Sequence, residues 1–160
     1  MISLVRSDER LIHGQCMQFI VSDYQIKRII VVDDLTATNP LLKSIFQTAV
    51  PKSLTTNVYT VSEALPEIAQ AVHDDVSTLL LMKNPRTFVI LLQKVPDLRP
   101  ELNIGPQMAK NGVKCTDFAT LHPEDVAAAK QLTEMGVHVF FNSIGVSGNV
   151  TEWTTVAKRI

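Results

Sequence analysis

The chain has 160 residues, of which 46% are hydrophobic and 19% are charged, and its formal net charge is −1; these values predict one soluble domain, residues 1–160, with a continuous core. No stretch approaches the roughly 20 apolar residues of a membrane span, which argues against a protein that is itself embedded in a bilayer. The absence of a basic run argues against nucleic-acid binding, because that binding needs clustered Lys and Arg.

Short apolar runs alternate with longer amphipathic segments along the chain, a pattern typical of parallel strands joined by crossover helices. In chain order, we predict strands over residues 2–5, 29–32, 55–60, 78–82, 102–105 and 137–141. We predict helices over residues 14–23, about 39–50, 62–72, 85–92 and 122–136. The predicted fold class is therefore α/β, a single domain built on an open, mainly parallel, doubly wound sheet with helices on both faces.

Local patterns add detail to these elements. Ser62 is expected to cap the helix that follows the third strand, and Gly136 is expected to end the last helix. Residues 114–121 fit either a strand or one arm of a hairpin. The residues expected on the inner faces of the first, second and last helices are Cys16, Met17, Phe19 and Ile20, then Leu41, Leu42, Ile45 and Phe46, then Val126, Ala129, Leu132 and Met135.

A polar loop, RSDERLIHGQ, leaves the first strand and runs directly into the first helix. In an open α/β sheet, ligands bind where loops leave the carboxyl ends of the strands, so this loop is the expected position for chemistry. The neutral imidazole of His13 can attack phosphorus while its second nitrogen donates a hydrogen bond, and Asp8 stands near enough to orient that nitrogen. His13 is therefore the candidate nucleophile, and Asp8 its orienting partner.

The same loop supplies groups that can bind a phosphate. A phosphorylated imidazole carries about two negative charges, which Arg6 and Arg10 can pair as a clamp. The backbone amides at the helix start point toward that position, and Gly14 lets an anion approach the backbone closely. The expected phosphate-binding residues are Gly14, Gln15 and Asn84, the last from the turn after the fourth strand, where a simple turn is an equal alternative.

Other polar clusters favour structural roles. Asp33 and Asp34 follow the second strand and are expected to cap a helix, whereas a magnesium site would need further acids that are absent from the matching strand ends. His73, Asp74 and Asp75 point in different directions at a helix end and are expected to be solvated. No metal and no cofactor are predicted.

The two cysteines, Cys16 and Cys115, lack the spacing of a disulfide framework or a C-x-x-C motif. They favour a reducing compartment, and the amino end shows no export signal, so a cytoplasmic location is expected. Cys16 is read as a small core residue, because a thiol on the inner face of a helix usually has that role.

The string Arg6-x-Asp8-Glu9-Arg10-Leu11-Ile12-His13-Gly14-Gln15 resembles the phosphorylation-site motif of the mannose, sorbose and N-acetylgalactosamine type of IIB component in the bacterial sugar phosphotransferase system. The resemblance continues through residues 28–34, the turn at 83–85, residues 103–105 and the helix at 125–136. It implies an enzyme of that system on an open, mainly parallel α/β fold. His13 would take phosphate from a phosphohistidine of the IIA component and pass it to a sugar that arrives through the membrane components IIC and IID, which would hold the protein at the inner face of the membrane.

Some positions depart from the family pattern. A tryptophan is usual where Ile20 falls, a basic residue is common where Asn142 and Ser143 stand, and Pro106-Gln107 interrupts the usual glycine-rich turn. The identity of the sugar is therefore not carried over, and the sequence leaves open whether the chain forms a homo-oligomer and whether IIA is a separate chain. A noncatalytic regulatory or docking protein on the same fold is the alternative. A nucleotide- or flavin-binding domain is disfavoured, because no G-x-G-x-x-G follows the first strand.

Overall fold

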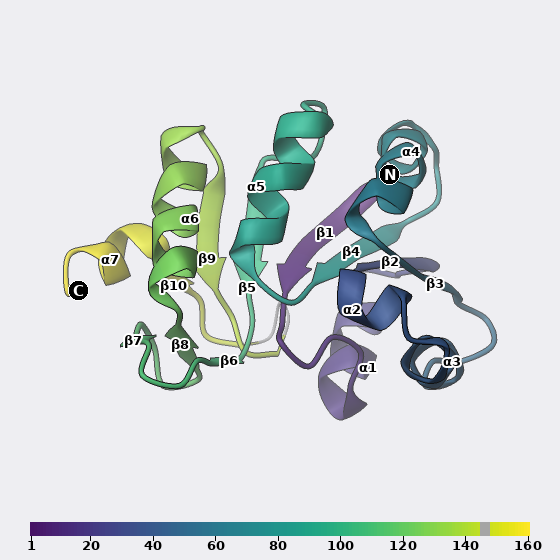
Figure 1. Ribbon diagram of the computed structural model, residues 1–160, viewed down its shortest axis with the longest axis horizontal. Coiled ribbons are helices and arrows are strands. Elements are labelled where there is room, and N and C mark those ends of the chain that lie inside the picture. The colour runs from purple at the N-terminus through teal and green to yellow at the C-terminus, as the bar shows by residue number, and fades with distance from the viewer. Residues whose placement is uncertain (145–147) are drawn as a thin grey trace.

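A computed structural model describes residues 1–144 and 148–160, without the side chains of Gln15 and Cys16. Seven strands form one sheet in the order β10-β9-β5-β1-β4-β2-β3, and every neighbouring pair is parallel except β9 with β10 (Figure 1). The strands are β1 (Ile2–Ser7), β2 (Arg28–Val32), β3 (Thr55–Tyr59), β4 (Thr78–Met82), β5 (Glu101–Ile104), β9 (His138–Phe141) and β10 (Thr151–Glu152). The predicted α/β class and mainly parallel sheet are confirmed.

The helices lie on both faces of this sheet. One hydrophobic cluster packs α1 (Gly14–Asp23), α2 (Asp34–Ala37) and α3 (Pro40–Thr48) on one face, through residues such as Met17 and Ile20. The other face carries α4 (Val61–His73), α5 (Pro85–Lys94), α6 (Pro123–Glu134) and α7 (Trp153–Ala157). Figure 1 shows α5 and α6 running side by side over the sheet. Because both faces are covered, the interior strand β4 is buried along its whole length, as its apolar sequence TLLLM requires.

Residues between 105 and 121 form a second, small sheet. It contains β6 (Gln107–Met108), β7 (Val113–Lys114) and β8 (Ala119–Leu121) in the order β6-β8-β7. The β7 and β8 strands pair antiparallel, so the hairpin interpretation of residues 114–121 is the correct one. The sequence analysis did not predict β10 and α7, because both elements are short and one strand has only two residues.

Several inner-face predictions were wrong. Phe19, Leu41, Ile45 and Met135 are 46%, 70%, 49% and 42% exposed. Phe19 comes two residues after Met17 and so points to the opposite side of α1, while Met17 and Ile20, three residues apart, share the buried side. In α3, Phe46 packs against the core while Leu41 and Ile45 face outward together. The side chain of Cys16 lies outside the described residues.

The helix caps also differ in part from expectation. Thr60, not Ser62, caps α4: its side chain accepts a hydrogen bond from the Glu63 amide, and the Glu63 carboxylate accepts one from the Thr60 amide. This reciprocal capping box satisfies two amides at once, which a cap at Ser62 would not do. Asp33 caps the short helix α2 through the Thr36 amide, as predicted, and Gly136 follows α6 with φ of 86°. Within the described residues, no helix combines the length and the hydropathy needed to cross a bilayer.

Candidate active site

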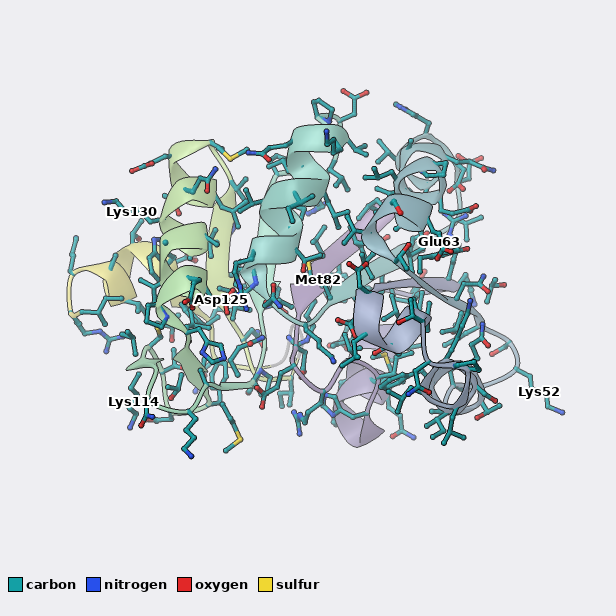
Figure 2. The ribbon with its side chains drawn as sticks, viewed as in Figure 1. Lys52, Glu63, Met82, Lys114, Asp125 and Lys130 are labelled. Carbon is teal, nitrogen blue, oxygen red and sulfur yellow. The ribbon has the colours of Figure 1, made fainter. Side chains whose placement is uncertain are left out.

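The polar loop between β1 and α1 leaves the sheet at the carboxyl ends of its central strands. The Asp8 amide donates to the Met82 carbonyl at 2.9 Å, and the Gly105 amide donates to the Ser7 carbonyl at 2.7 Å. Met82, at the end of β4, lies near the middle of the molecule (Figure 2). The loop is therefore anchored between β4 and β5, at the edge where ligands bind in open α/β sheets.

Further contacts fix the course of this loop. The Glu9 amide donates to the Pro106 carbonyl, and the Glu9 carboxylate accepts a hydrogen bond from the Met108 amide at 2.9 Å, which ties the loop to β6. Leu11 is buried and has a φ of 56°, in the left-handed region that non-glycine residues seldom adopt. Its amide donates to the Asp8 carbonyl in a tight turn that brings the chain back toward the start of α1. The loop is therefore folded into one defined path from Asp8 to His13.

That path places His13 against Asp8. The His13 Nε2 atom lies 2.9 Å from the Asp8 Oδ2 atom, and the carboxylate is 1% exposed while the imidazole is 21% exposed. Since an ionised carboxylate only accepts hydrogen bonds, Nε2 carries the proton of the neutral ring and Nδ1 carries the lone pair. In the part of the chain that the structure describes, Nδ1 has no hydrogen-bond partner. The pair that the sequence predicts is thus brought together, with one defined nitrogen left for reaction.

Asp8 is held in its ionised form by several groups. Burial by itself raises the pKa of the Asp8 carboxyl, but the hydrogen bond with His13 and the charge of Arg6 outweigh it, so the pKa lies below its ordinary value of 3.8. The Arg10 amide also donates to Oδ1 at 3.0 Å, and the Arg6 guanidinium donates to Oδ2 at 3.3 Å. At neutral pH the acid is therefore a fixed, negatively charged acceptor.

The two arginines, Arg6 near the end of β1 and Arg10 in the loop, occupy different environments. Arg6 is 1% exposed, and its guanidinium donates to the side-chain oxygen of Asn103 and to the carbonyls of Asn142 and Ser143. Arg10 is 52% exposed, and its Nε atom lies 3.6 Å from Asp8 Oδ1. The sequence predicts one role for both residues, whereas the structure places one inside the protein and the other at the surface beside His13.

The start of α1 is open. His13 is the N-cap residue, and its side chain does not cap the helix. Gly14 has a φ of 23°, and a Cβ atom built on it would meet nothing within 4 Å, so the backbone in front of the helix is accessible. Gln15 belongs to α1, but its side chain lies outside the described residues.

Asn84 has a structural role in the turn before α5, which agrees with the second of the two alternatives that the sequence left open. Its Oδ1 atom accepts from the Thr87 amide at 3.1 Å and so caps α5. The neighbouring Lys83 forms an ion pair with Asp33 at 3.2 Å. Among the described residues, the Asn84 side chain bonds to Thr87 and forms no hydrogen bond with His13, so the predicted phosphate-binding role gains no geometric support from this side chain.

Two residues that the sequence analysis did not select belong to this site. Asn103 is 1% exposed and bonds to Arg6, and Gly105 lies so close to Arg6 that a Cβ atom built on it would fall 2.4 Å from a guanidinium nitrogen. The available signal was a lone carboxamide inside the apolar run LNI, followed by a glycine. Two residues that depart from the family pattern can also be placed. Ile20 is buried in the core, and the Gln107 side chain donates to the Lys83 carbonyl at 2.8 Å.

Two hollows are lined by residues of this loop. A mainly apolar groove of about 720 Å³ runs along α1 from His13 and is closed by the segment after α3. A smaller hollow of about 420 Å³ lies between Arg10, Glu9 and the small sheet. His13 therefore lines the larger hollow and Arg10 the smaller one.

Clusters elsewhere have structural explanations. His73 and Asp75 are exposed, but Asp74 is partly buried and binds Arg28 through two hydrogen bonds of 2.8 and 2.9 Å, so the expectation of solvation was wrong for Asp74. These bonds hold the pKa of the Asp74 carboxyl well below its usual range. Among the described residues, no three His, Cys, Asp or Glu side chains gather as metal ligands would.

Comparison with known proteins gives a consistent result. The family model described as the PTS system sorbose subfamily IIB component matches residues 2–159. The sorbose-specific EIIB component of Lacticaseibacillus casei is 30% identical over 137 residues, which are 85% of this chain and 83% of that protein. The mannose-specific EIIAB component of Escherichia coli (strain K12) is 23% identical over 158 residues, 98% of this chain and 49% of that protein, so this chain spans about half of its length.

Solved structures share the fold. The IIBSor domain of the sorbose permease from Klebsiella pneumoniae superposes with a TM-score of 0.87 at 23% identity, covering 99% of this chain and 97% of that chain. The manxB protein from Thermoanaerobacter tengcongensis gives a TM-score of 0.85 at 28% identity, covering 99% and 96%. The sheet order and the helix positions are therefore those of a known group of structures.

Proposed function

Because the chain belongs to the sorbose subfamily of IIB components of the sugar phosphotransferase system, we propose that His13 is its phosphate-carrying residue. Components of this family are transferases that act with IIA and with the membrane components IIC and IID in sugar uptake. The observation that carries the residue assignment is the His13–Asp8 pair: a buried, ionised acid fixes Nε2 and leaves Nδ1 as the partly exposed nucleophile.

Phosphate would enter by direct displacement. The lone pair on Nδ1 attacks the phosphorus of the donor phosphohistidine, the new N–P bond forms, and the donor N–P bond breaks as its imidazole leaves. Asp8 stabilises the positive charge that develops on the His13 ring through the proton on Nε2. In the second half of the cycle a sugar hydroxyl attacks the same phosphorus, the N–P bond of His13 breaks, and the hydroxyl proton leaves to solvent or to the released ring.

Arg10 is the arginine suited to clamp the phosphate. It is exposed beside His13, and its guanidinium can pair with phosphate oxygens in the fork geometry that suits them. The amides of Gly14 and Gln15 at the start of α1 would supply further donors, and the positive end of the helix dipole favours an anion there. Asn84 could donate to the phosphate only through its side-chain nitrogen Nδ2, because its Oδ1 atom caps α5.

Partner proteins must reach the same atom. We propose a phosphorylated IIA component as the donor, docked over the surface that carries His13, and IIC and IID as the components that present the sugar and hold the protein at the membrane. The fused A and B parts in the name of the mannose-specific relative, together with the apolar groove that opens at His13, support a donor protein at this face. A broad panel of sugars, tested with the membrane components, would identify the acceptor.

The assignment is tested by labelling. Incubation with phosphorylated IIA should add one acid-labile phosphate, and His13→Ala should abolish it. His138→Ala, which removes an exposed histidine far along the chain, is the matched control and should label like wild type. Unchanged labelling of His13→Ala would refute the carrier assignment.

Transfer of the phosphate from His13 to a sugar would distinguish a carrier from a regulatory protein on the same fold. Phosphorylated protein mixed with membranes that contain its IIC and IID should lose its phosphate to a sugar. A phosphoprotein that stays charged across the whole panel would favour the regulatory alternative.

A further inference from the structure

Asn103 is an unusual residue for its position. It stands in the middle of β5, between Leu102 and Ile104, which are fully buried in the cluster on one face of the sheet. Side chains alternate along a strand, so Asn103 faces the opposite side of the sheet from Leu102 and Ile104, and it is 1% exposed. A buried carboxamide in a strand is unfavourable unless its polar atoms are bonded, so its presence calls for a local reason.

The reason is on the neighbouring strand. Arg6 pairs in register with Asn103 across β1 and β5, and the guanidinium Nη1 donates to the Asn103 Oδ1 atom. The Asn103 Nδ2 atom, in contrast, is buried and has no hydrogen-bond partner among the described residues. The side chain therefore satisfies Arg6 while half of its own hydrogen-bonding capacity stays unused.

The guanidinium has little freedom to move away. Its Nη1 atom also donates to the Asn142 carbonyl at 2.9 Å, and its Nη2 atom donates to the Ser143 carbonyl at 2.9 Å and to Asp8 at 3.3 Å. Gly105 presses against the same group, because a Cβ atom there would overlap Nη2. Arg6 is thus seated between β5 and the end of β9, with one nitrogen turned toward the acid that holds His13.

A neutral acceptor suits this position better than an acid. The carboxamide fixes the orientation of the guanidinium without neutralising its charge, so the charge remains available to Asp8. An aspartate at position 103 would satisfy Arg6 equally well and would remove the unpaired amide, but it would compete with Asp8 for the same cation. The choice of asparagine therefore matches a requirement of Asp8 rather than of the strand.

We infer that Asn103 is a positioning residue, which acts through Arg6 and Asp8 to keep the His13 proton on Nε2 and its lone pair on Nδ1. The inference rests on the proposed function of His13. Asn103 does not touch the phosphate; it orients the cation that orients the acid that fixes the ring. A purely structural role for Asn103 would affect stability and leave the state of the His13 ring unchanged.

The test reads the ring directly. Nitrogen NMR of ¹⁵N-labelled histidine, recorded on the unphosphorylated protein, distinguishes the two neutral tautomers of His13. Wild type should show the Nε2–H form alone, and Asn103→Leu, which keeps the size and removes the acceptor, should show a mixture. Transfer from phosphorylated IIA should then slow by roughly 10- to 100-fold in kcat, with KM for the donor nearly unchanged.

Matched variants separate positioning from general damage. Ser7→Ala removes a buried, unpaired hydroxyl next to Arg6 on the other face of β1, and it should leave both tautomer and rate as in wild type. Ile104→Val lowers core packing in the same strand without reaching Arg6, and it should also keep the wild-type tautomer. Asn103→Asp keeps an acceptor for Arg6 but competes with Asp8 for its charge, so it should also show a mixture of the two tautomers.

If Asn103→Leu does not fold, Asn103→Thr takes its place, because a β-branched residue suits a strand and its hydroxyl is too short to reach Arg6. A folded variant without the acceptor that keeps the Nε2–H form and transfers at the wild-type rate would overturn the inference. The tautomer measurement needs no donor, so its outcome is separate from the labelling of His13→Ala, which decides the carrier assignment itself.

Discussion

Two histidine–carboxylate pairs in this protein have nearly the same length and different surroundings. His13 lies 2.9 Å from Asp8, and His138 lies 2.8 Å from Glu152. Asp8 is 1% exposed and is backed by Arg6, whereas Glu152 is 45% exposed and stands at the edge of the sheet on β10. His138 also lies 3.5 Å from Glu101 and stacks on Phe140.

The comparison shows that pairs of nearly equal contact distance can differ in burial and in the groups behind the acid. In the His138 pair, both partners are about half exposed to water and each ring nitrogen faces an acid, so no single lone pair is presented. At the loop, burial removes water from the acid, and the cation behind it keeps the acid ionised. The variants below break or sharpen this difference, beginning with the largest expected effect.

Replacement of Asp8 should separate the two pairs most clearly. In Asp8→Asn the amide group must face either the Arg10 amide or the side that holds Arg6 and His13, and all of these donate hydrogen bonds to the native acid. With Nδ2 toward His13, the ring must accept on Nε2 and carry its proton on Nδ1, the wrong tautomer for attack. We expect phosphotransfer to slow roughly 100- to 10,000-fold, about 2.7 to 5.5 kcal/mol.

The matched variant is Glu152→Gln, which makes the same change at the exposed pair. Its rate of phosphate acceptance, measured by rapid quench with phosphorylated IIA, should equal that of wild type. Equal rates for Asp8→Asn and wild type would mean that the buried pair does no more for the ring than the exposed one.

Arg6 supports the buried acid, and its loss should appear first in stability. Arg6→Ala leaves Asp8 ionised and without its cation inside the protein, and it leaves the carbonyls of Asn142 and Ser143 without their donor. Removal of one partner of a buried pair costs about 3 to 5 kcal/mol of the free energy of unfolding, which urea denaturation measures. This outcome differs from the small effect expected for an arginine that only clamps phosphate.

Arg10 should behave in the opposite way. Its side chain is 52% exposed, so Arg10→Ala should change the free energy of unfolding by less than about 0.5 kcal/mol. Phosphotransfer should slow roughly 10- to 1000-fold, about 1.4 to 4 kcal/mol, because the charge on the transferring group loses its clamp. Single-turnover transfer at the wild-type rate would assign Arg10 to the surface alone.

The sequence predicts the frame of this site better than its interior. Apolar periodicity predicts the succession of strands and helices along the chain. The polar string at the end of the first strand predicts the position of the loop and the pairing of His13 with Asp8. Arg6 and Arg10 look alike in sequence, because nothing local tells which of two arginines four residues apart will be buried. Asn103 lies 97 residues from Arg6, so only the pairing of β1 with β5 reveals their contact.

The errors in the fold have a similar origin. Apolar residues were assigned to inner faces from periodicity, but α3 has no fully buried residue, and its outward Leu41 and Ile45 cannot be recognised without the sheet that the helix covers. The cap at Thr60 was missed because Ser62 is an equally good capping residue, and only the reciprocal bond with Glu63 decides between them. Short elements such as β10 carry too few residues to show a period.

The smallest effect is expected at the exposed pair, where it depends on pH. Burial alone would lower the pKa of His138, but Glu152 and Glu101 outweigh it, so the pKa is raised above its ordinary value of 6.5. A raised pKa in the folded state stabilises the protein fully below pH 6.5, and this stabilisation is lost as the pH rises through the raised value. Because the ring is half exposed, His138→Gln should remove only a few tenths of a kcal/mol, about 0.3 to 0.5, at pH 6 and nothing at pH 9. Urea unfolding at the two pH values measures the difference, and an equal loss at both would show that the ring contributes packing against Phe140 rather than charge.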